Sequence, residues 1–305
     1  MAGPPVGPHG AMTSGRPVEV APGVVRVLAP NPGPMTGPGT NTYLLGADTP
    51  VVIDPGPDDD AHLEALLDAT GGTVAAILVT HTHVDHSPLA RRLRQATGAP
   101  VLAYGPAPAP AAGLDSHESG FRPDRRLAGG QVVELAGLTI TAVHTPGHTS
   151  NHLCFLVDGM LFSGDHVMSG STVVIAPTDG DMGAYLRSLR AVRRLAPARI
   201  APGHGTMVDD PAAVLDYYLA HRLERERLVA AALQAAGPDG ASAGALVEGV
   251  YEDVPASLHP VARYSLWAHL RYLGEQGRAT CPEPDDVDAP WRAVRDGGST
   301  AGGRR

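Results

Sequence analysis

Three histidines and one aspartate crowd into six positions of this chain, in the segment "HTHVDH" from His81 to His86. The segment follows the apolar run 74–79, which predicts a buried strand. It precedes residues 87–98, whose apolar spacing and Ser-Pro start predict a helix with Ser87 as N-cap. In such a loop, imidazole nitrogens and a carboxylate can converge on one point, as a divalent cation requires. The chain is therefore constrained to a fold whose strand ends carry a metal site.

Three further polar side chains stand at the ends of later apolar strands, each beside a glycine. His148 follows "AVHTPG", Asp165 closes "LFSGD", and His204 lies in "APGHG". Glycine lets the backbone approach a crowded centre without a side-chain clash. Because loops at one edge of a sandwich can meet over a shared cleft, these three residues can join the first cluster.

We therefore predict a pair of metal ions held by seven side chains. Asp165 bridges the two ions, and the remaining ligands are His81, His83 and His148 for one ion and Asp85, His86 and His204 for the other. Imidazole and carboxylate ligands together suit Zn2+, with Mn2+ or Fe2+ as alternatives. The predicted catalytic residues are Asp85, which orients the attacking water and carries its proton, and the bridging Asp165. His144 and His166 flank ligands and are either groups that orient them or structural residues.

Strand-like and helical segments alternate along the chain. Between residues 17 and 210, short apolar runs bounded by Gly, Pro or Asp alternate with helical patterns, which predicts an α/β fold of two sheets flanked by helices. Residues 1–16 are rich in Pro and Gly and predict a disordered leader. Residues 211–281 predict a long helix followed by the outline of a winged helix. The polar residues 282–305 predict a mobile tail, in which Trp291 is the residue that can dock.

Composition excludes several classes of function. The chain has no lysine, so Schiff-base chemistry and a P-loop lysine are excluded. Its two cysteines are too few for a disulfide framework or a thiolate metal cage, and they favour a cytoplasmic location. A net charge of −9 argues against non-specific binding to nucleic acid or anionic membranes. No apolar run reaches the roughly 18 residues of a membrane span.

The blocks "HTHVDH", "TPGHT", "SGDH" and "PGHG", in this order, resemble the metallo-β-lactamase superfamily over residues 17–210. More narrowly, "NPGPMTGPGTNTYLLG", "GDMGAYLRSL" and the C-terminal outline are similar to the β-lactamase-like subgroup with a C-terminal winged helix. That subgroup includes an animal mitochondrial single-strand endoribonuclease, and fungal acyl-carrier-protein thioesterases are similar as well. The resemblance implies an αβ/βα sandwich, the seven ligands assigned above and a binuclear zinc hydrolase.

The predicted reaction is attack by a metal-bound hydroxide on an electrophilic carbonyl or phosphorus. We expect a small-molecule acyl ester or thioester as substrate, with single-stranded RNA as the alternative. Residues 206–280 hold ten acidic residues against six arginines, which disfavours the phosphate contacts of RNA binding. A persulfide dioxygenase with one iron is a minor alternative, and the oligomeric state stays open.

Other functions fit the residues less well. Asp165 and His204 are 39 positions apart, which leaves no room for the insertion of the RNA- and DNA-processing nucleases in this superfamily. His83 stands where the flavin-linked di-iron oxygen reductases carry a glutamate. Glyoxalase II-type thioesterases have a helical C-terminal domain instead. A non-catalytic DNA-binding regulator would have no need of seven ligands.

Overall fold

The computed structural model describes residues 12–108 and 117–294. It divides into two compact units, one up to His221 and one from Arg222. Each unit has its own core of buried apolar side chains.

The first unit begins with a seven-stranded mixed sheet. Its strands, in pairing order, are β1 (Val18–Ala21), β2 (Val24–Leu28), β3 (Asn41–Leu45), β4 (Val51–Ile53), β5 (Ala76–Leu78), β6 (Val101–Ala103) and β7 (Arg125–Arg126). The strands from β1 to β4 are antiparallel and those from β4 to β7 are parallel. The parallel part is connected by α1 (Asp60–Thr70) and α2 (Leu89–Thr97), as parallel pairing requires.

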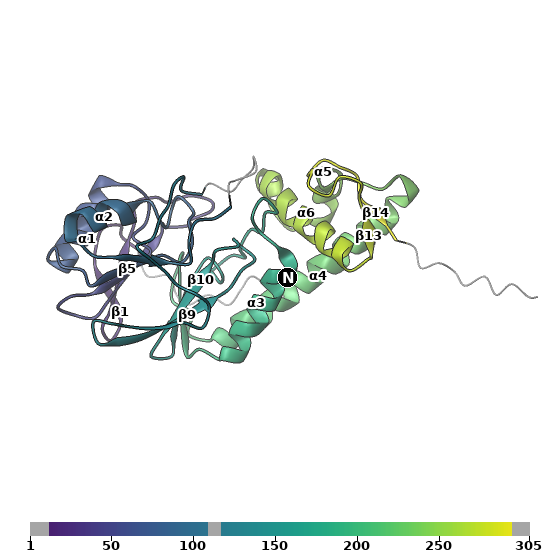
Figure 1. The fold of residues 1–305 in the computed structure, drawn as a ribbon. Helices are drawn as coiled ribbons and strands as arrows, with labels where there is room; N and C mark the ends of the chain where they lie inside the picture. The colour runs from purple at the N-terminus through teal and green to yellow at the C-terminus, as the bar shows by residue number, and fades with distance from the viewer. Residues whose placement is uncertain (1–11, 109–116, 295–305) are drawn as a thin grey trace, which may run out of the picture. The chain divides into compact units, whose positions relative to one another are not determined.

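The second sheet has five strands. Their pairing order is β12 (Arg199–Pro202), β11 (Met160–Gly164), β10 (Leu153–Val157), β9 (Leu138–His144) and β8 (Val132–Leu135). The helix α3 (Met182–Leu195) joins β11 to β12, which are parallel. In Figure 1, α1 and α2 lie together near β5, and α3 lies beside β9 and β10.

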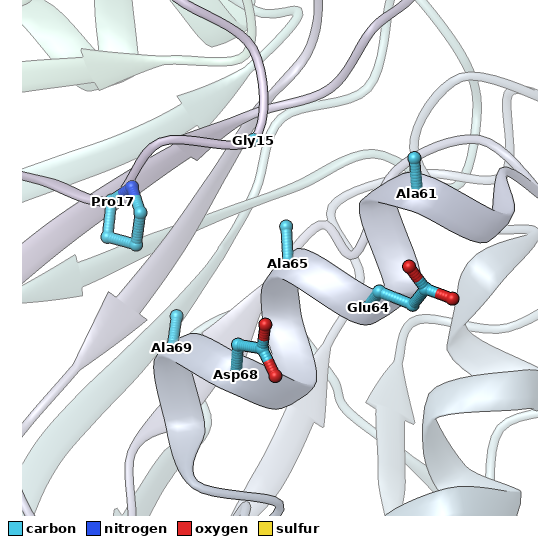
Figure 2. A pocket seen from close by; sticks show the side chains of 7 residues that line it. All are labelled: Gly15, Pro17, Ala61, Glu64, Ala65, Asp68 and Ala69. Atoms are coloured by element: carbon cyan, nitrogen blue, oxygen red, sulfur yellow. The ribbon is translucent and has the colours of Figure 1, made fainter.

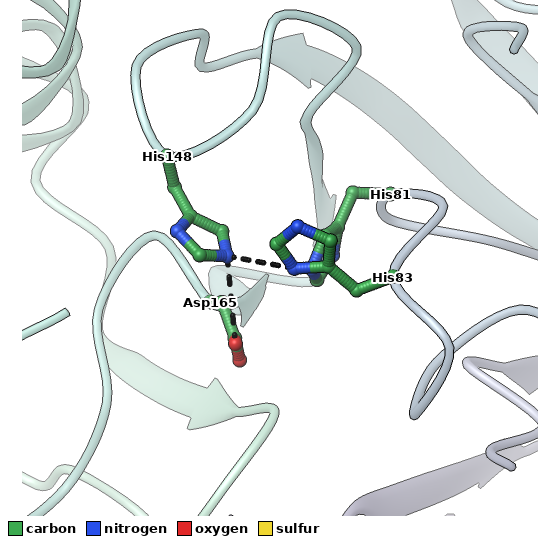
Figure 3. Close-up of side chains that lie close together, drawn as sticks. All are labelled: His81, His83, His148 and Asp165. Atoms are coloured by element: carbon green, nitrogen blue, oxygen red, sulfur yellow. Dashed lines mark hydrogen bonds and ion pairs between the residues drawn. The ribbon is translucent and has the colours of Figure 1, made fainter. Parts of the chain in front are cut away.

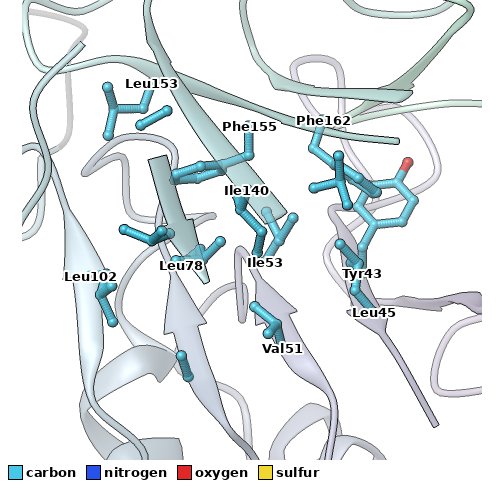
Figure 4. Close-up of a cluster of buried hydrophobic side chains, with 14 of the residues drawn as sticks. Tyr43, Leu45, Val51, Ile53, Leu78, Leu102, Ile140, Leu153, Phe155 and Phe162 are labelled. Carbon is cyan, nitrogen blue, oxygen red and sulfur yellow. The ribbon is translucent and has the colours of Figure 1, made fainter. Parts of the chain in front are cut away.

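Side-chain alternation along the strands builds the layers. Val51 and Ile53 of β4 enter a core between the two sheets, where Phe155 and Phe162 approach from the second sheet (Figure 4). Val52, between them in sequence, instead joins a second core formed with the buried residues of α1 and α2. The predicted arrangement of two sheets flanked by helices is confirmed.

The second unit is small and mainly helical. The long helix α4 (Pro211–Ala235) runs into it and is followed by the short turn η1 (Gly237–Asp239), α5 (Ala243–Val250), η2 (Ala256–Leu258), α6 (His259–Glu275), β13 (Ala279–Thr280) and β14 (Arg292–Ala293). Its core includes Val247, Leu266, Leu270 and Trp291. Two helices followed by an antiparallel two-stranded ribbon are the predicted winged-helix outline.

Three expectations at segment ends need correction or restriction. The mobile tail does not extend over 282–294, because Trp291 is only 3% exposed and β14 pairs with β13. The leader falls mostly on residues 1–11, outside the described part, while the Gly15 N–H donates to the Leu28 carbonyl. The N-cap of α2 is Pro88 rather than Ser87, since the Ser87 hydroxyl donates to Glu118 instead. No helix in the described residues combines the length and apolar character needed to cross a bilayer.

Candidate metal centre

All seven predicted ligands come from loops that follow strands of the two sheets. His81, His83, Asp85 and His86 lie between β5 and α2, and the other three are His148 after β9, Asp165 after β11 and His204 after β12. The donor atoms form two groups, each within 4.8 Å: His81, His83, His148 and Asp165 in one, and Asp85, His86 and His204 in the other. Figure 3 shows the first group, with rings from separate loops pointing toward one another. The six ligands predicted to bind a single ion divide between the two groups as assigned, and Asp165 falls in the first group.

Distances within the first group are those of donor atoms around a shared point. His83 Nδ1 lies 3.0 Å from His81 Nε2 and 3.1 Å from His148 Nε2. His148 Nε2 lies 3.7 Å from Asp165 Oδ2. Four ligands at about 2.1 Å from zinc lie about 3.4 Å from one another in a tetrahedron. The spacing therefore fits a tetrahedral cation site.

The second group has a similar geometry and takes in the other oxygen of Asp165. His204 Nε2 lies 3.2 Å from Asp85 Oδ2 and 3.3 Å from Asp165 Oδ1. His86 Nε2 lies 3.5 Å and 3.4 Å from the same two oxygens. Each oxygen of Asp165 thus faces a different group, so one carboxylate lies within reach of both.

Hydrogen bonds on the far side of the rings determine which nitrogen carries the proton. Nδ1 of His148 lies 2.9 Å from the Val174 carbonyl, and Nδ1 of His204 lies 3.2 Å from the Gly39 carbonyl. A carbonyl only accepts, so in both rings the proton lies on Nδ1. The lone pair of the neutral ring then lies on Nε2 and points into the centre, as metal binding requires.

Asp54, which no motif in the sequence indicated, fixes the position of the ring proton in two other histidines. Its carboxylate accepts from the Thr80 N–H and hydroxyl, both at 2.7 Å, and from His86 Nδ1 at 2.9 Å. Since the Thr80 hydroxyl proton goes to Asp54, its oxygen accepts from His81 Nδ1 at 3.0 Å. Both rings therefore carry a proton on Nδ1 and face the centre with Nε2. Despite burial, Asp85, Asp165 and Asp54 raise the pKa of His86, so its Nε2 also holds a proton until a cation displaces it. The only local signal was the position of Asp54 at the end of the apolar strand "VVID".

The buried charges act in two directions. Burial lowers the pKa of His81, His83 and His148, which keeps these imidazoles neutral. Burial also opposes charge on His204, but Asp165 and Asp85 outweigh it and raise the pKa of His204 to about 9. A divalent cation must displace such protons, and the same negative charge attracts it. This donor set thus fits the metal that the motifs imply.

Glycine leaves space for the ligands, as predicted. A Cβ atom on Gly203 would lie 2.7 Å from Asp165 Oδ1 and 2.8 Å from His86 Cε1. A Cβ atom on Gly147 would lie 2.3 Å from the Tyr185 Cα, so α3 could not pack against the loop of His148.

The flanking histidines His144 and His166 contact residues outside the predicted ligand set. The His144 ring stacks on Tyr104, with centroids 4.4 Å apart, and its Nε2 lies 3.0 Å from the Ser150 carbonyl. His166 is buried, and its carbonyl accepts from the Tyr185 hydroxyl. Neither ring is hydrogen-bonded to a predicted ligand in the described contacts.

A surface hollow of about 430 Å³ lies against α1, apart from this centre. Figure 2 shows the seven residues that line it: Gly15, Pro17, Ala61, Glu64, Ala65, Asp68 and Ala69. They include no histidine and none of the seven predicted ligands.

Family models match residues 35–204 to the metallo-beta-lactamase superfamily and residues 242–283 to the beta-lactamase associated winged helix domain. The chain is 33% identical over 277 residues to a Drosophila melanogaster protein named beta-lactamase-like protein 2 homolog, across 87% of this chain and 92% of that protein. It is 33% identical over 251 residues to an atrochrysone carboxyl ACP thioesterase of Aspergillus chevalieri, across 79% and 74% of the two chains.

Solved structures agree with these matches. The crystal structure of a beta-lactamase domain protein from Burkholderia ambifaria superposes with a TM-score of 0.78 at 25% identity, across 93% of this chain and 95% of that one. The first family model covers more than half of the 305 residues. The chain therefore belongs to the metallo-beta-lactamase superfamily, as a metal-dependent hydrolase with a C-terminal winged helix domain.

Proposed function

We propose that this protein is a binuclear zinc hydrolase that cleaves small acyl thioesters or esters. The observation that carries the proposal is the convergence of two groups of mostly buried donor side chains on the two oxygens of one carboxylate. Two groups support two cations rather than the single iron of a persulfide dioxygenase. Zinc suits the mixed imidazole and carboxylate donors, with manganese or iron as substitutes.

His81, His83 and His148 would hold one cation, Asp85, His86 and His204 the other, and Asp165 both. When bound, the two cations would supply Lewis-acid activation of a water molecule and of the attacked carbonyl. Asp85 is the residue that we assign to orient this water and take its proton. Its side chain is 23% exposed, against 11% for Asp165, so water can reach it. Despite burial, neighbouring His86 lowers the pKa of Asp85 to about 2 and keeps the carboxylate ionised.

The acyl substrate class is supported by similarity and by charge. The relative from Aspergillus chevalieri carries the name of a thioesterase, and the similarity extends across 79% of this chain. Residues 206–280, which include the winged helix, carry ten acidic residues against six arginines. Because RNA phosphates are bound mainly by basic side chains, this balance favours an acyl substrate over RNA.

Two further assignments concern the catalytic region and the cellular location. We assign hydrolysis to residues 17–210 and propose a cytoplasmic location, which is supported by two free cysteines, Cys154 and Cys281.

The decisive experiment compares substrates on one metal-characterised preparation. The purified protein is analysed for bound metals, then assayed with an S-acyl-N-acetylcysteamine thioester and with a single-stranded RNA oligonucleotide. We expect about two zinc ions per chain, faster thioester cleavage, and loss of turnover on chelation that zinc restores. No bound transition metal would refute the metal centre, and faster RNA cleavage would refute the substrate class.

A further inference from the structure

His117 lies against the loop that carries the first histidines, although it is 34 positions from His83 in the sequence. The two residues form an antiparallel backbone bridge, and the Glu118 N–H donates to the Thr82 carbonyl at 2.7 Å. Their rings are 4.7 Å apart between centroids, with planes inclined by 39°. The His117 side chain is only 4% exposed. His117 therefore packs on one face of a predicted ligand.

Hydrogen bonds fix the orientation of the His117 ring. Asn151 Nδ2 donates to the Thr82 hydroxyl oxygen at 2.9 Å. The Thr82 hydroxyl oxygen lies 2.9 Å from His117 Nδ1. Among the described contacts, His117 Nδ1 is the acceptor for the Thr82 hydroxyl proton. The ring proton then lies on His117 Nε2, which faces Asp179 Oδ2 at 3.5 Å.

This network connects the loops of two ligands. Asp179 Oδ2, which lies 3.5 Å from His117 Nε2, accepts a hydrogen bond from the Ser150 N–H at 2.9 Å, in the loop that carries His148. His117 thus stands between the loop of His83 and the loop of His148, whose ring nitrogens are 3.1 Å apart. No corresponding contact in the described residues joins His117 to Asp85, His86 or His204.

We propose that His117 is a positioning residue that holds His83 at the correct distance from His148 and so determines affinity for one of the two cations. The proposal rests on the proposed metal centre. It assigns His117 no contact with substrate. Loss of a residue that orients a metal ligand typically lowers metal affinity by about 10–100-fold.

The test measures metal affinity in His117→Ala by competition with a chromophoric chelator, together with the absorption spectrum of the Co2+-loaded protein. We expect one ion to bind about 10–100-fold more weakly, with the other unchanged and the Co2+ spectrum altered. In His117→Asn, the side-chain oxygen can replace Nδ1 as the acceptor for Thr82, so we expect partial recovery. His259→Ala, which removes a histidine bonded to backbone carbonyls in the second unit, is the control.

Double variants identify which ion is weakened. Added to His204→Ala, His117→Ala should weaken binding of the remaining ion about 10–100-fold. Added to His148→Ala, it should change little, because both act on the same site. Wild-type affinity and spectrum in His117→Ala would overturn the proposal, as would equal weakening of both ions with a lowered melting temperature of the metal-free protein. A wild-type protein that holds no metal would instead refute the proposed function.

Discussion

Removal of the Asp54 carboxylate tests how the outer hydrogen bonds support the metal centre. In Asp54→Ala, three buried donors lose their acceptor: the Thr80 N–H, the Thr80 hydroxyl and His86 Nδ1. A buried donor without a partner costs about 1–3 kcal/mol. Water entering the vacated space satisfies part of this need, so we expect the metal-free protein to lose about 3–5 kcal/mol of stability.

The effect on metal binding follows from the His86 ring. Without Asp54, no carboxylate holds the proton on Nδ1 of the neutral His86 ring that binds a metal, and that proton can move to Nε2, which faces the centre. We expect metal affinity to fall about 10–100-fold, or about 1.4–2.7 kcal/mol. Chelator competition measures this loss, and urea unfolding of the metal-free protein measures the loss of stability.

The control must reproduce the backbone of Asp54, which has a positive φ of 49°. Asp158 has a φ of 46° and an exposed side chain, so Asp158→Ala carries the same cost of a left-handed alanine without touching the centre. Equal metal affinity in Asp54→Ala and Asp158→Ala would refute the reasoning. Asp54→Asn tolerates this φ and keeps one acceptor oxygen, so it should show a smaller loss in the same direction.

Three further predictions concern other parts of the chain. Asp165→Ala should abolish hydrolysis while circular dichroism stays native, because one carboxylate serves both groups of donors; wild-type turnover would contradict this. Burial lowers the pKa of His62 to about 4. As the pH falls below 6.5, His62 takes up a proton in the unfolded state but not in the folded state. His62 should therefore cost the folded state about 3 kcal/mol of stability between pH 6.5 and 4. His62→Gln should flatten this part of the stability curve, and an unchanged slope would count against it. Trp291→Ala should destabilise the second unit by about 3–5 kcal/mol in thermal unfolding, whereas a freely moving tail would show no change.

Local patterns predicted much of the architecture because each strand and helix has its own periodicity. The helical pattern at 182–196 agrees with α3 (Met182–Leu195), and the apolar run at 74–79 contains β5. The seven predicted ligands were selected by a local pattern too, since each follows an apolar strand, and in the structure their donor atoms lie close together in two groups. Parallel and antiparallel pairing then brings these strand ends to one edge.

The roles of Asp54 and His117 could not be predicted from a local pattern, because their partners are distant in sequence. Asp54 directly follows β4, and only the parallel pairing of β4 with β5 brings its carboxylate to Thr80 and His86. His117 lies beside His83 because the two residues form an isolated backbone bridge, which no local sequence pattern indicates. The mobile tail was predicted over too long a segment because polar composition outweighed Trp291, the one residue in it that was expected to dock.

The backbone carbonyls that accept hydrogen bonds from the ligand rings are harder to predict from sequence than the side chains that would bind the metal. His148 and His204 are oriented by the carbonyls of Val174 and Gly39, and any residue type supplies a carbonyl. The inner donors need particular side chains, since only nitrogen and oxygen ligands of the right charge can hold a divalent cation. Residue identity can therefore predict which side chains bind a metal, whereas the protonation state that allows binding depends on the folded backbone. At Gly39, an added Cβ atom would lie 2.2 Å from the Ala29 carbonyl oxygen, so a substitution there should move the backbone and weaken metal binding. At Val174, a change of side chain that leaves the carbonyl in place should leave metal affinity unchanged.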